Sequence, residues 1–434
     1  MSALITSPRT LGLLRRRTEY ARRLLGRPHR VHYFHQVDDP YSALTVQLLE
    51  QFAARYEVEL LCHLVRAPDA AAAPEPRMLE DYSLRDAVAI AGSMGLRFDA
   101  PAGRPSDSSL RLATRALAAA LDSGTMPAAA AVVSDVLWRG GERAVEKVAA
   151  SLLQSGPDDT RVASLFDEGG RLRSKLGHYL GATFYYAGEW YWGVDRLHYL
   201  EQRLGDLGLC RSSFDGGAQA QPLVEPAVVA APAASGEGFT LEYFPSLRSP
   251  YTAIVTPRVF EFAERSGVDL RVRPVLPMVM RGLAVPRAKR VYILRDTARE
   301  ARRLGVPFGR VSDPLGRPVE RALSLYDWAR GQGREREYLL AFYDLVWAHG
   351  VDAGSDTGLR RIVERAGLQW QGARSVVDND DWRGEVEQNR VDMMAAGCWG
   401  VPSFRLSGPG LDEPLVTWGQ DRLWLLERAL TGLS

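Results

Sequence analysis

The segment HYFHQVDDPYSAL (residues 32–44) occurs a second time, in altered form, as EYFPSLRSPYTAI (residues 242–254). The copies lie 210 residues apart, and both keep a Tyr-Phe pair, a Pro-Tyr pair and an alanine at matching positions. At the same offset, PRMLEDYSLRDAVAIAGSMGLRF (76–98) aligns with PRAKRVYILRDTAREARRLGVPF (286–308). Matches in the same order at a fixed offset indicate that the chain contains one kind of domain twice.

A third match lies near the end of each copy, where WGVDRLHYLEQRL (192–204) corresponds to WGQDRLWLLERAL (418–430). Its offset of 226 requires only insertions between the matching blocks. A stretch rich in Ala, Pro and Gly separates the copies and has the composition of a linker. We therefore expect a basic helical arm, a first domain, a linker and a second domain, over residues 1–29, 30–210, 211–238 and 239–434.

The composition excludes several classes of protein. The 434 residues contain 54 Lys and Arg against 53 Asp and Glu, a net charge of +1. This balance argues against a nucleic-acid partner, because phosphate binding needs a basic field. The three cysteines, Cys62, Cys210 and Cys398, are odd in number and widely spaced. They exclude a disulfide framework and a cysteine-based zinc site, and the histidines show no ligand spacing either, so we expect no metal.

The first thirty residues carry eight Arg and one Glu among several leucines. They lack the apolar core of a secretory signal, and no apolar run in the chain reaches the ~18 residues of a membrane span. We expect a cytoplasmic protein whose arm is a solvated helix leaning on the first domain. The alternatives are that the arm binds an anionic membrane surface or that it resembles a transit peptide.

Both copies predict the same order of elements. A strand leads through a turn into a helix that starts at proline, and a second β-rich run follows, which is a βαβ unit with parallel pairing. A long helical region, two short strands and a closing amphipathic helix complete each copy. This order predicts an α/β fold of two tandem thioredoxin-like domains, each with an inserted helical subdomain. The expected strands, first helices, second strands and closing helices cover 31–36 and 240–244, 40–54 and 250–265, 57–65 and 268–276, and 193–204 and 419–431.

The second copy contains a candidate site at RSPYTA (248–253). Ser249 stands at the expected N-cap of the first helix and Pro250 at its first position, which each residue type prefers. The amino terminus of a helix stabilises an anion or a thiolate. Capping of the helix alone is the other interpretation of Ser249.

Four segments of the second copy together resemble 2-hydroxychromene-2-carboxylate isomerases and kappa-class glutathione transferases, which are soluble relatives of DsbA-like oxidoreductases. The resemblance covers nearly all of 239–434. It implies a thioredoxin fold, a glutathione cofactor and a small-molecule substrate. The segments are YFPSLRSPYTA (243–253), LRDTAREARRLGVPF (294–308), GVPSF (400–404) and WGQDRLWLLERAL (418–430).

The resemblance also implies roles for single residues. Ser249 corresponds to the catalytic serine that donates a hydrogen bond to the glutathione thiolate. Val401 precedes the expected cis-proline, Pro402, and corresponds to the residue that pairs with the glutathione backbone. Asp421, beside Gln420, corresponds to the aspartate that holds the γ-glutamyl end. Because no cysteine stands at this turn, direct dithiol exchange is excluded.

The sequence departs from the family in the loop at 278–290, which is short and lacks the asparagine that contacts glutathione in family members. Arg273, Arg287, Lys289 and Arg290 are candidates to receive a carboxylate, although each is also explained as solvated surface charge.

The first copy keeps the predicted order of elements but has different residues at the positions of the candidate site. Asp39 replaces the serine, and Thr183 falls where the proline is expected. A carboxylate at the helix terminus would repel a thiolate, so we interpret this domain as degenerate. Because the family that the second copy resembles consists mostly of homodimers, the resemblance implies that the first domain is a built-in partner in an intramolecular pseudo-dimer, with further oligomers left open. An acid/base or metal role for His35, Asp38 and Asp39 is the alternative.

These observations predict a glutathione-dependent isomerase or transferase that acts on a small unsaturated or aromatic substrate. The competing hypothesis is a DsbA-like module without catalysis that binds a thiol or a protein partner. The missing asparagine favours the second hypothesis, whereas Ser249, Pro402 and Asp421 favour the first.

Overall fold

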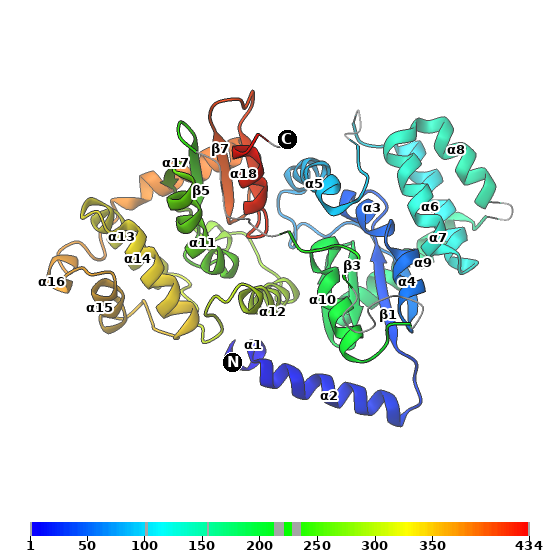
Figure 1. Ribbon diagram of the computed structural model, residues 1–434, viewed down its shortest axis with the longest axis horizontal. Helices are drawn as coiled ribbons and strands as arrows, with labels where there is room; N and C mark the ends of the chain where they lie inside the picture. The colour runs from blue at the N-terminus through cyan, green and yellow to red at the C-terminus, as the bar shows by residue number, and fades with distance from the viewer. Residues whose placement is uncertain (1, 100–102, 154–155, 212–220, 228–235, 433–434) are drawn as a thin grey trace. The chain divides into compact units, whose positions relative to one another are not determined.

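The computed structural model describes residues 2–99, 103–153, 156–211, 221–227 and 236–432 (Figure 1). Most of the expected linker, residues 212–220 and 228–235, lies outside the described residues. The chain divides into two compact units. Residues 12–227 form the N-terminal unit, and residues 228–434 together with residues 1–11 form the C-terminal unit.

The N-terminal unit contains a four-stranded sheet in the order β2-β1-β3-β4. Strands β1 and β2 are parallel, β3 is antiparallel to β1, and β4 is antiparallel to β3. Tyr33 and Phe34 of β1 and Phe184 of β3 are fully buried in its core. The strands are β1 Arg30–His35, β2 Glu59–Leu64, β3 Thr183–Tyr186 and β4 Glu189–Trp192.

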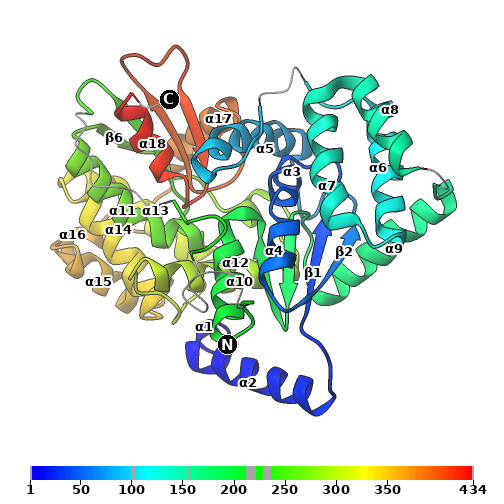
Figure 2. The same ribbon diagram turned by 45° about the vertical axis from the view of Figure 1, so that its right-hand side comes forward.

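Helices α3 and α4 follow β1, where the sequence predicted one continuous helix over 40–54. Gln47 lies at the break, and its side-chain amide bonds to both the carbonyl and the N–H of Arg97, at 2.8 and 3.0 Å. Helices α6, α7 and α8 pack together, and α9 runs from them along β2 (Figure 2). The helical elements are α3 Pro40–Val46, α4 Leu49–Arg55, α5 Pro76–Ala91, η1 Gly92–Met94, α6 Asp107–Asp122, α7 Met126–Asp135, the π-helix η2 Val136–Gly140, α8 Gly141–Leu152, α9 Asp159–Leu176 and α10 Gly193–Asp206.

The C-terminal unit repeats this sheet in the order β6-β5-β7-β8, with the same pairing directions. Tyr243 of β5 stacks on Phe404 of β7, with ring centroids 5.2 Å apart, at the centre of the core. Two equivalent sheets confirm the prediction of two thioredoxin-like domains with inserted helices. The strands are β5 Thr240–Phe244, β6 Asp269–Val272, β7 Ser403–Ser407 and β8 Leu415–Trp418.

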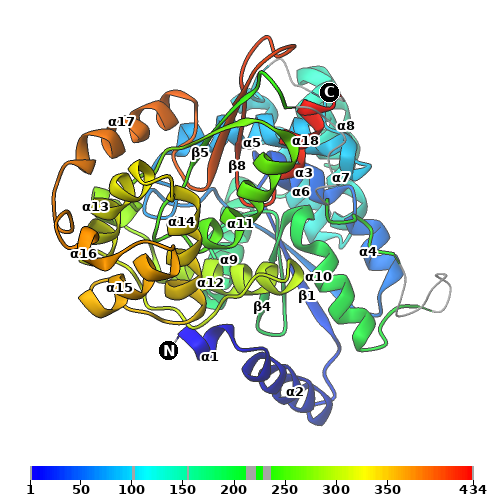
Figure 3. The ribbon, with the colours of Figure 1, turned by 60° about the vertical axis from the view of Figure 1, so that its left-hand side comes forward.

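The inserted helices of the C-terminal unit run from α13 to α17 (Figure 3). As in the N-terminal unit, one of them passes into a π-helix that contains a tryptophan. The indole N–H of that residue, Trp347, donates to the carbonyl of Leu247 in the β5–α11 loop at 3.2 Å, so the inserted helices hold the loop that precedes Ser249. The elements are α11 Pro250–Ser266, η4 Met278–Arg281, α12 Arg287–Arg303, α13 Arg317–Gly331, α14 Glu335–Tyr343, the π-helix η5 Asp344–Ala348, α15 Asp356–Arg365, α16 Trp370–Ala373, α17 Trp382–Ala395 and α18 Leu423–Leu430.

The N-terminal arm consists of α1 (Ser2–Thr6) and α2 (Pro8–Leu24). We expected the whole arm to lean on the first domain, but residues 1–11 belong to the C-terminal unit. The reason is polar docking of α1, since the hydroxyls of Ser2 and Thr6 donate to the carbonyls of Val311 and Gly309 at 3.2 and 3.1 Å. Among the described residues, no helix combines the length and the apolar character needed to cross a bilayer.

Candidate functional site

Ser249 is the N-cap of α11, as the sequence predicted. Its backbone is extended, and its Oγ accepts a hydrogen bond from the N–H of Thr252 at 3.2 Å. A hydroxyl that accepts in this way still has its own proton to donate, and the described part of the chain offers no acceptor for it. The side chain is only 8% exposed. Ser249 thus brings a nearly buried O–H donor to a helix amino terminus, where the helix dipole favours negative charge.

The polar groups around Ser249 differ in how far their bonding is satisfied. Arg248 makes a two-point ion pair with Asp313 at 2.7 and 2.8 Å, so its charge is already balanced. The hydroxyl oxygens of Ser246 and Thr252 are buried, and within the described structure they have no hydrogen-bond partner. Buried hydroxyls are usually satisfied. The hydroxyls of Ser246 and Thr252, one before and one after Ser249 in the sequence, make this turn a polar site within an apolar core.

The loop before β7 contains a cis peptide bond between Val401 and Pro402. The carbonyl of Pro402 accepts from the N–H of Gly419 at 3.0 Å, which ties this loop to the end of β8. Gly400 lies so close to Trp418 that a Cβ added there would come within 2.2 Å of the indole. The loop is therefore held on both sides by the end of β8 and the glycine that follows it.

Of the four basic residues proposed to receive a carboxylate, Lys289 lies beside this loop. Its Nζ is 5.1 Å from the ring centroid of Trp399, two residues before Val401, and burial lowers the pKa of Lys289 to about 8. Arg273 is instead bound by Glu242, Asp392 and Asn389.

The remaining two candidates, Arg287 and Arg290, are exposed.

The sequence placed Gln420 and Asp421 at the start of the closing helix, and this prediction is wrong, because α18 begins at Leu423. The side chain of Gln420, 1% exposed, turns inward and donates to Glu300 at 2.7 Å, while Arg258 donates to the backbone carbonyl of Gln420 at 3.1 Å. These contacts hold residue 420 in the preceding turn. Asp421 is half-buried and lies 3.6 Å from the guanidinium of Arg422.

Asp39 of the N-terminal unit occupies the position of Ser249 and also caps its helix. Its carboxylate accepts from the N–H groups of Tyr41 and Ser42, at 3.2 and 3.0 Å, and from the hydroxyl of Ser42 at 2.9 Å. Burial raises the pKa of Asp39 to about 6. In this unit the chain itself therefore supplies the anion at the helix terminus.

The structure gives little support to the alternative acid/base or metal role of His35, Asp38 and Asp39. His35 is fully buried, which lowers its pKa to about 3, and its Nδ1 lies 3.3 Å from the hydroxyl of Tyr33. Asp38 is exposed and accepts from the side chain of Gln36. No cluster of three or more potential metal ligands occurs among the described residues.

The placement of Thr183 at the proline position is also wrong by one residue. Thr183 pairs with Phe34 as Ser403 pairs with Phe244, so Thr183 corresponds to Ser403. Ala182 then corresponds to Pro402, and its carbonyl accepts from Gly193 at 2.7 Å in the way that Pro402 accepts from Gly419.

The register of the strands therefore shows which residue of the first copy matches Pro402, and the sequence offset alone did not.

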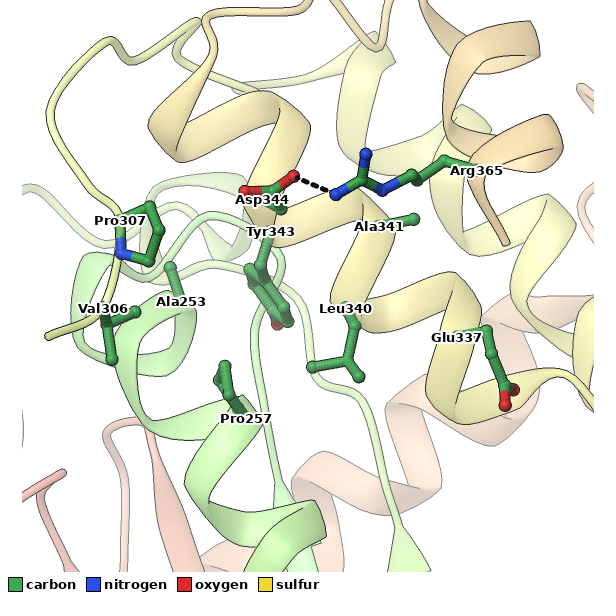
Figure 4. A pocket seen from close by; sticks show the side chains of 10 residues that line it. All are labelled: Ala253, Pro257, Val306, Pro307, Glu337, Leu340, Ala341, Tyr343, Asp344 and Arg365. Atoms are coloured by element: carbon green, nitrogen blue, oxygen red, sulfur yellow. Dashed lines mark hydrogen bonds and ion pairs between the residues drawn. The ribbon is translucent and has the colours of Figure 1, made fainter. Parts of the chain in front are cut away.

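A pocket of about 300 Å³ opens beside α11 in the C-terminal unit and was not predicted (Figure 4). Helix α11 and residues 306–307 line one side of it and α14 the other, with the Asp344–Arg365 ion pair across one end (3.3 Å). Spacing along the helix could have indicated it, because two lining residues stand four and eight positions after Ser249. The lining residues are Ala253, Pro257, Val306, Pro307, Glu337, Leu340, Ala341, Tyr343, Asp344 and Arg365.

Comparison with known proteins identifies the C-terminal unit. Residues 240–431 match the family model described as the DSBA-like thioredoxin domain. A particular relative is 2-hydroxychromene-2-carboxylate isomerase from Sphingobium xenophagum. It is 25% identical over 205 residues, which span 44% of this chain and 97% of the relative.

Two solved structures illustrate the likeness. A 2-hydroxychromene-2-carboxylate isomerase aligns with a TM-score of 0.38 and 17% identity over 45% of this chain and 95% of its own. The cytosolic disulfide reductase DsbM from Pseudomonas aeruginosa aligns with a TM-score of 0.33 and 20% identity over 44% of this chain and 98% of its own.

Proposed function

We propose that the C-terminal domain is a glutathione-dependent isomerase or transferase for a small unsaturated or aromatic substrate. One observation carries the proposal. In the N-terminal unit the carboxylate of Asp39 fills the anion position at the helix terminus, whereas in the C-terminal unit the neutral hydroxyl of Ser249 caps the helix and keeps a proton to donate. The second arrangement suits an anion that arrives with a ligand.

A thiolate is the anion that best fits the residues present. A free thiol has a pKa of ~8.5, and a hydroxyl donor together with a helix amino terminus would lower it. Glutathione, when bound, would supply the nucleophilic sulfur. Ser249 would hold that sulfur ionised and oriented, and Val401 and Pro402 would align the peptide backbone of the ligand. No cysteine stands at 249–252, and Cys398, the cysteine of this domain, is buried, so we propose that the reacting thiol comes from outside the chain.

The pocket and Lys289 support a small, largely apolar substrate that carries an acid group. Ala253 lies one helical turn after Ser249 and lines the pocket, whose walls are mostly aliphatic. The ammonium group of Lys289, with a pKa of about 8, remains largely protonated near neutral pH and would attract a carboxylate. We propose that the pocket holds the carbon skeleton and that Lys289 favours the acid group of the substrate or of glutathione.

A thiol- or protein-binding module without catalysis is the second candidate, and the state of Gln420 favours it. Its amide is committed to Glu300 and is not presented to a ligand. The proposed contacts to glutathione are therefore fewer than the resemblance implied, with Asp421 as the remaining candidate for the γ-glutamyl end.

Calorimetry with two ligands and two variants tests the proposal. Glutathione and S-methylglutathione differ in the thiol, and wild type should bind glutathione roughly 10- to 100-fold more tightly, because a hydrogen bond to a charged group contributes ~1.5–3 kcal/mol. Ser249→Ala should bind the two ligands equally.

Ser355→Ala is the matched control, because Ser355 caps α15 through the N–H of Gly358 at 3.0 Å and should leave the preference unchanged. A wild type that does not bind glutathione at millimolar concentration would refute the proposal. Binding without turnover of any unsaturated acid would favour the second candidate.

A further inference from the structure

Helix α2 leaves one side of the N-terminal arm uncovered. None of its residues is buried, and Leu13, Tyr20 and Leu24 are 65, 71 and 73% exposed. These three stand at positions i, i+7 and i+11, which places them on one side of an α-helix. We call this surface the arm face. Exposed large apolar side chains that share one side of a helix, instead of being scattered singly over the surface, are a feature of interaction sites.

The opposite side of α2 is anchored, so the arm face has a fixed direction. Arg15 makes a two-point ion pair with Glu189 of β4, at 2.7 and 2.8 Å, and Glu189 is buried. Leu11 and Arg22 are half-buried on the same side as Arg15. The helix therefore holds its polar contacts to the N-terminal unit on one side and turns Leu13, Tyr20 and Leu24 to solvent on the other.

Charge defines what the arm face can bind. Arg16 and Arg17 flank Leu13 and Tyr20, are exposed, and have no acidic partner among the described residues. The first thirty residues hold eight Arg and one Glu, which leaves a net charge of −6 on the rest of a chain whose total is +1. A strongly basic helix has thus been placed on an acidic protein, and its positive charge is concentrated beside exposed apolar side chains.

We infer that the arm face binds an anionic phospholipid surface, with α2 lying in the plane of the interface. Exposed leucines and a tyrosine beside arginines are the combination that an interfacial helix needs, because the apolar side chains enter the acyl boundary while the guanidinium groups meet lipid phosphates. The inference does not depend on the thiol chemistry proposed for Ser249.

The other occupants fit less well. A stable contact with a second copy buries ~800 Å² on each partner, more than three side chains of one helix provide. A nucleic acid would use the arginines but would leave the leucines in water, since binding to a phosphate backbone is mainly electrostatic.

Vesicle co-sedimentation of the full chain tests the inference. With phosphatidylglycerol mixed into phosphatidylcholine vesicles, we expect binding at least tenfold tighter than to phosphatidylcholine alone. The gain should fall several-fold when salt is raised from ~0.1 to ~0.5 M, because the Debye length shortens. Equal affinity for both vesicles, or affinity for neither, would overturn the inference.

Two variants locate the binding. Arg16→Gln with Arg17→Gln, and separately Leu13→Ser with Tyr20→Ser and Leu24→Ser, should each reduce binding to anionic vesicles at least tenfold. The matched controls are Arg360→Gln with Arg361→Gln on α15, and Val132→Ser with Leu315→Ser and Val391→Ser, which remove the same number of exposed groups elsewhere.

The controls should bind as wild type does. Equal losses in variants and controls would contradict a specific role of the arm face, as would a dimer, detected by sedimentation, that the arm variants abolish while vesicle binding persists.

Discussion

At the scale of single residues, Ser249 and Asp39 differ in one property that matters for function. Both cap a helix, so both stabilise their own domain, but only Asp39 brings a charge. This makes it possible to separate capping from ligand binding at Ser249 by exchanging one cap for the other.

Ser249→Asp should keep the helix cap and abolish the preference for glutathione, because a carboxylate at this position would repel the thiolate. Ser249→Ala should lose both the cap and the preference, with the free energy of unfolding lower by ~1 kcal/mol. Thermal unfolding and calorimetry on both variants check this. A Ser249→Asp protein that still discriminates glutathione from its S-methyl derivative would show that the thiolate does not lie at the helix terminus.

Asp39 should make the stability of the N-terminal unit depend on pH. Its folded pKa of about 6 lies above the unfolded value near 3.8, so the protonated form is favoured by folding. The resulting stabilisation is complete below about pH 4 and is lost as the pH rises through about 6.

Urea unfolding of wild type and Asp39→Asn between pH 4 and 8 isolates this contribution. The stability of wild type relative to the variant should fall by about 1–3 kcal/mol across the range. A constant difference would mean that the hydrogen bonds from Tyr41 and Ser42 cancel the effect of burial on the pKa of Asp39, and a difference that rises with pH would mean that they outweigh it.

Much of the site could be predicted from the sequence because capping is local. A serine or aspartate before Pro-Tyr at the start of an apolar helix can be predicted as the N-cap from the local sequence alone, without the tertiary structure. Gln420 could not be placed in this way. Its inward turn depends on Glu300 and Arg258, which come from two other helices, whereas the matching residue in the first copy is Val194, which has no side-chain polar atom to be drawn inward.

At the scale of elements, strands and helices were predicted where they bury a regular pattern of apolar side chains. The register of the strands was harder to predict than their presence, because register is set by hydrogen bonds between strands that are distant in the sequence. The one-residue error at Thr183 follows from this, since the offset between copies changes inside the inserted helices. The break between α3 and α4 was also missed, because Gln47 bonds to a residue fifty positions away.

The contact between α9 and β2 offers a test at this scale. A Cβ on Gly169 would lie 2.1 Å from the backbone carbonyl oxygen of Leu64, whereas one on Gly170 would meet nothing within 4 Å. Gly169→Ala should therefore destabilise the N-terminal unit by ~1–3 kcal/mol or more, and Gly170→Ala should stabilise it by up to ~1 kcal/mol. Chemical denaturation of this adjacent pair gives the comparison. Similar effects of both substitutions would contradict the close packing of α9 on the sheet.

At the scale of the whole molecule, the repeat predicted two copies of one fold, and the two equivalent sheets confirm it. The division of the arm was not predictable, because the hydroxyls of Ser2 and Thr6 meet carbonyls that lie some three hundred residues further along the chain. A contact of such range leaves no local pattern in the sequence.

Thr6→Ala should loosen the segment around Gly309 by removing the hydrogen bond to its carbonyl. Hydrogen exchange should become faster at residues 302–312, with unchanged exchange in the sheet of the N-terminal unit. Thr10→Ala on α2 is the control. Unaltered exchange at 302–312 would show that α1 contributes nothing to the order of this segment.

The carboxylate of Asp39 has a consequence for the number of ligand or inhibitor molecules that one chain can bind. A molecule with two copies of a fold would ordinarily be expected to titrate with two equivalents of ligand. Because one copy already carries its own negative group at the helix terminus, a thiolate-mimicking inhibitor should saturate at one equivalent per chain. The N-terminal domain thus acts as a non-binding control within the same chain. Asp39→Ser is the first single substitution in which to look for a second bound equivalent.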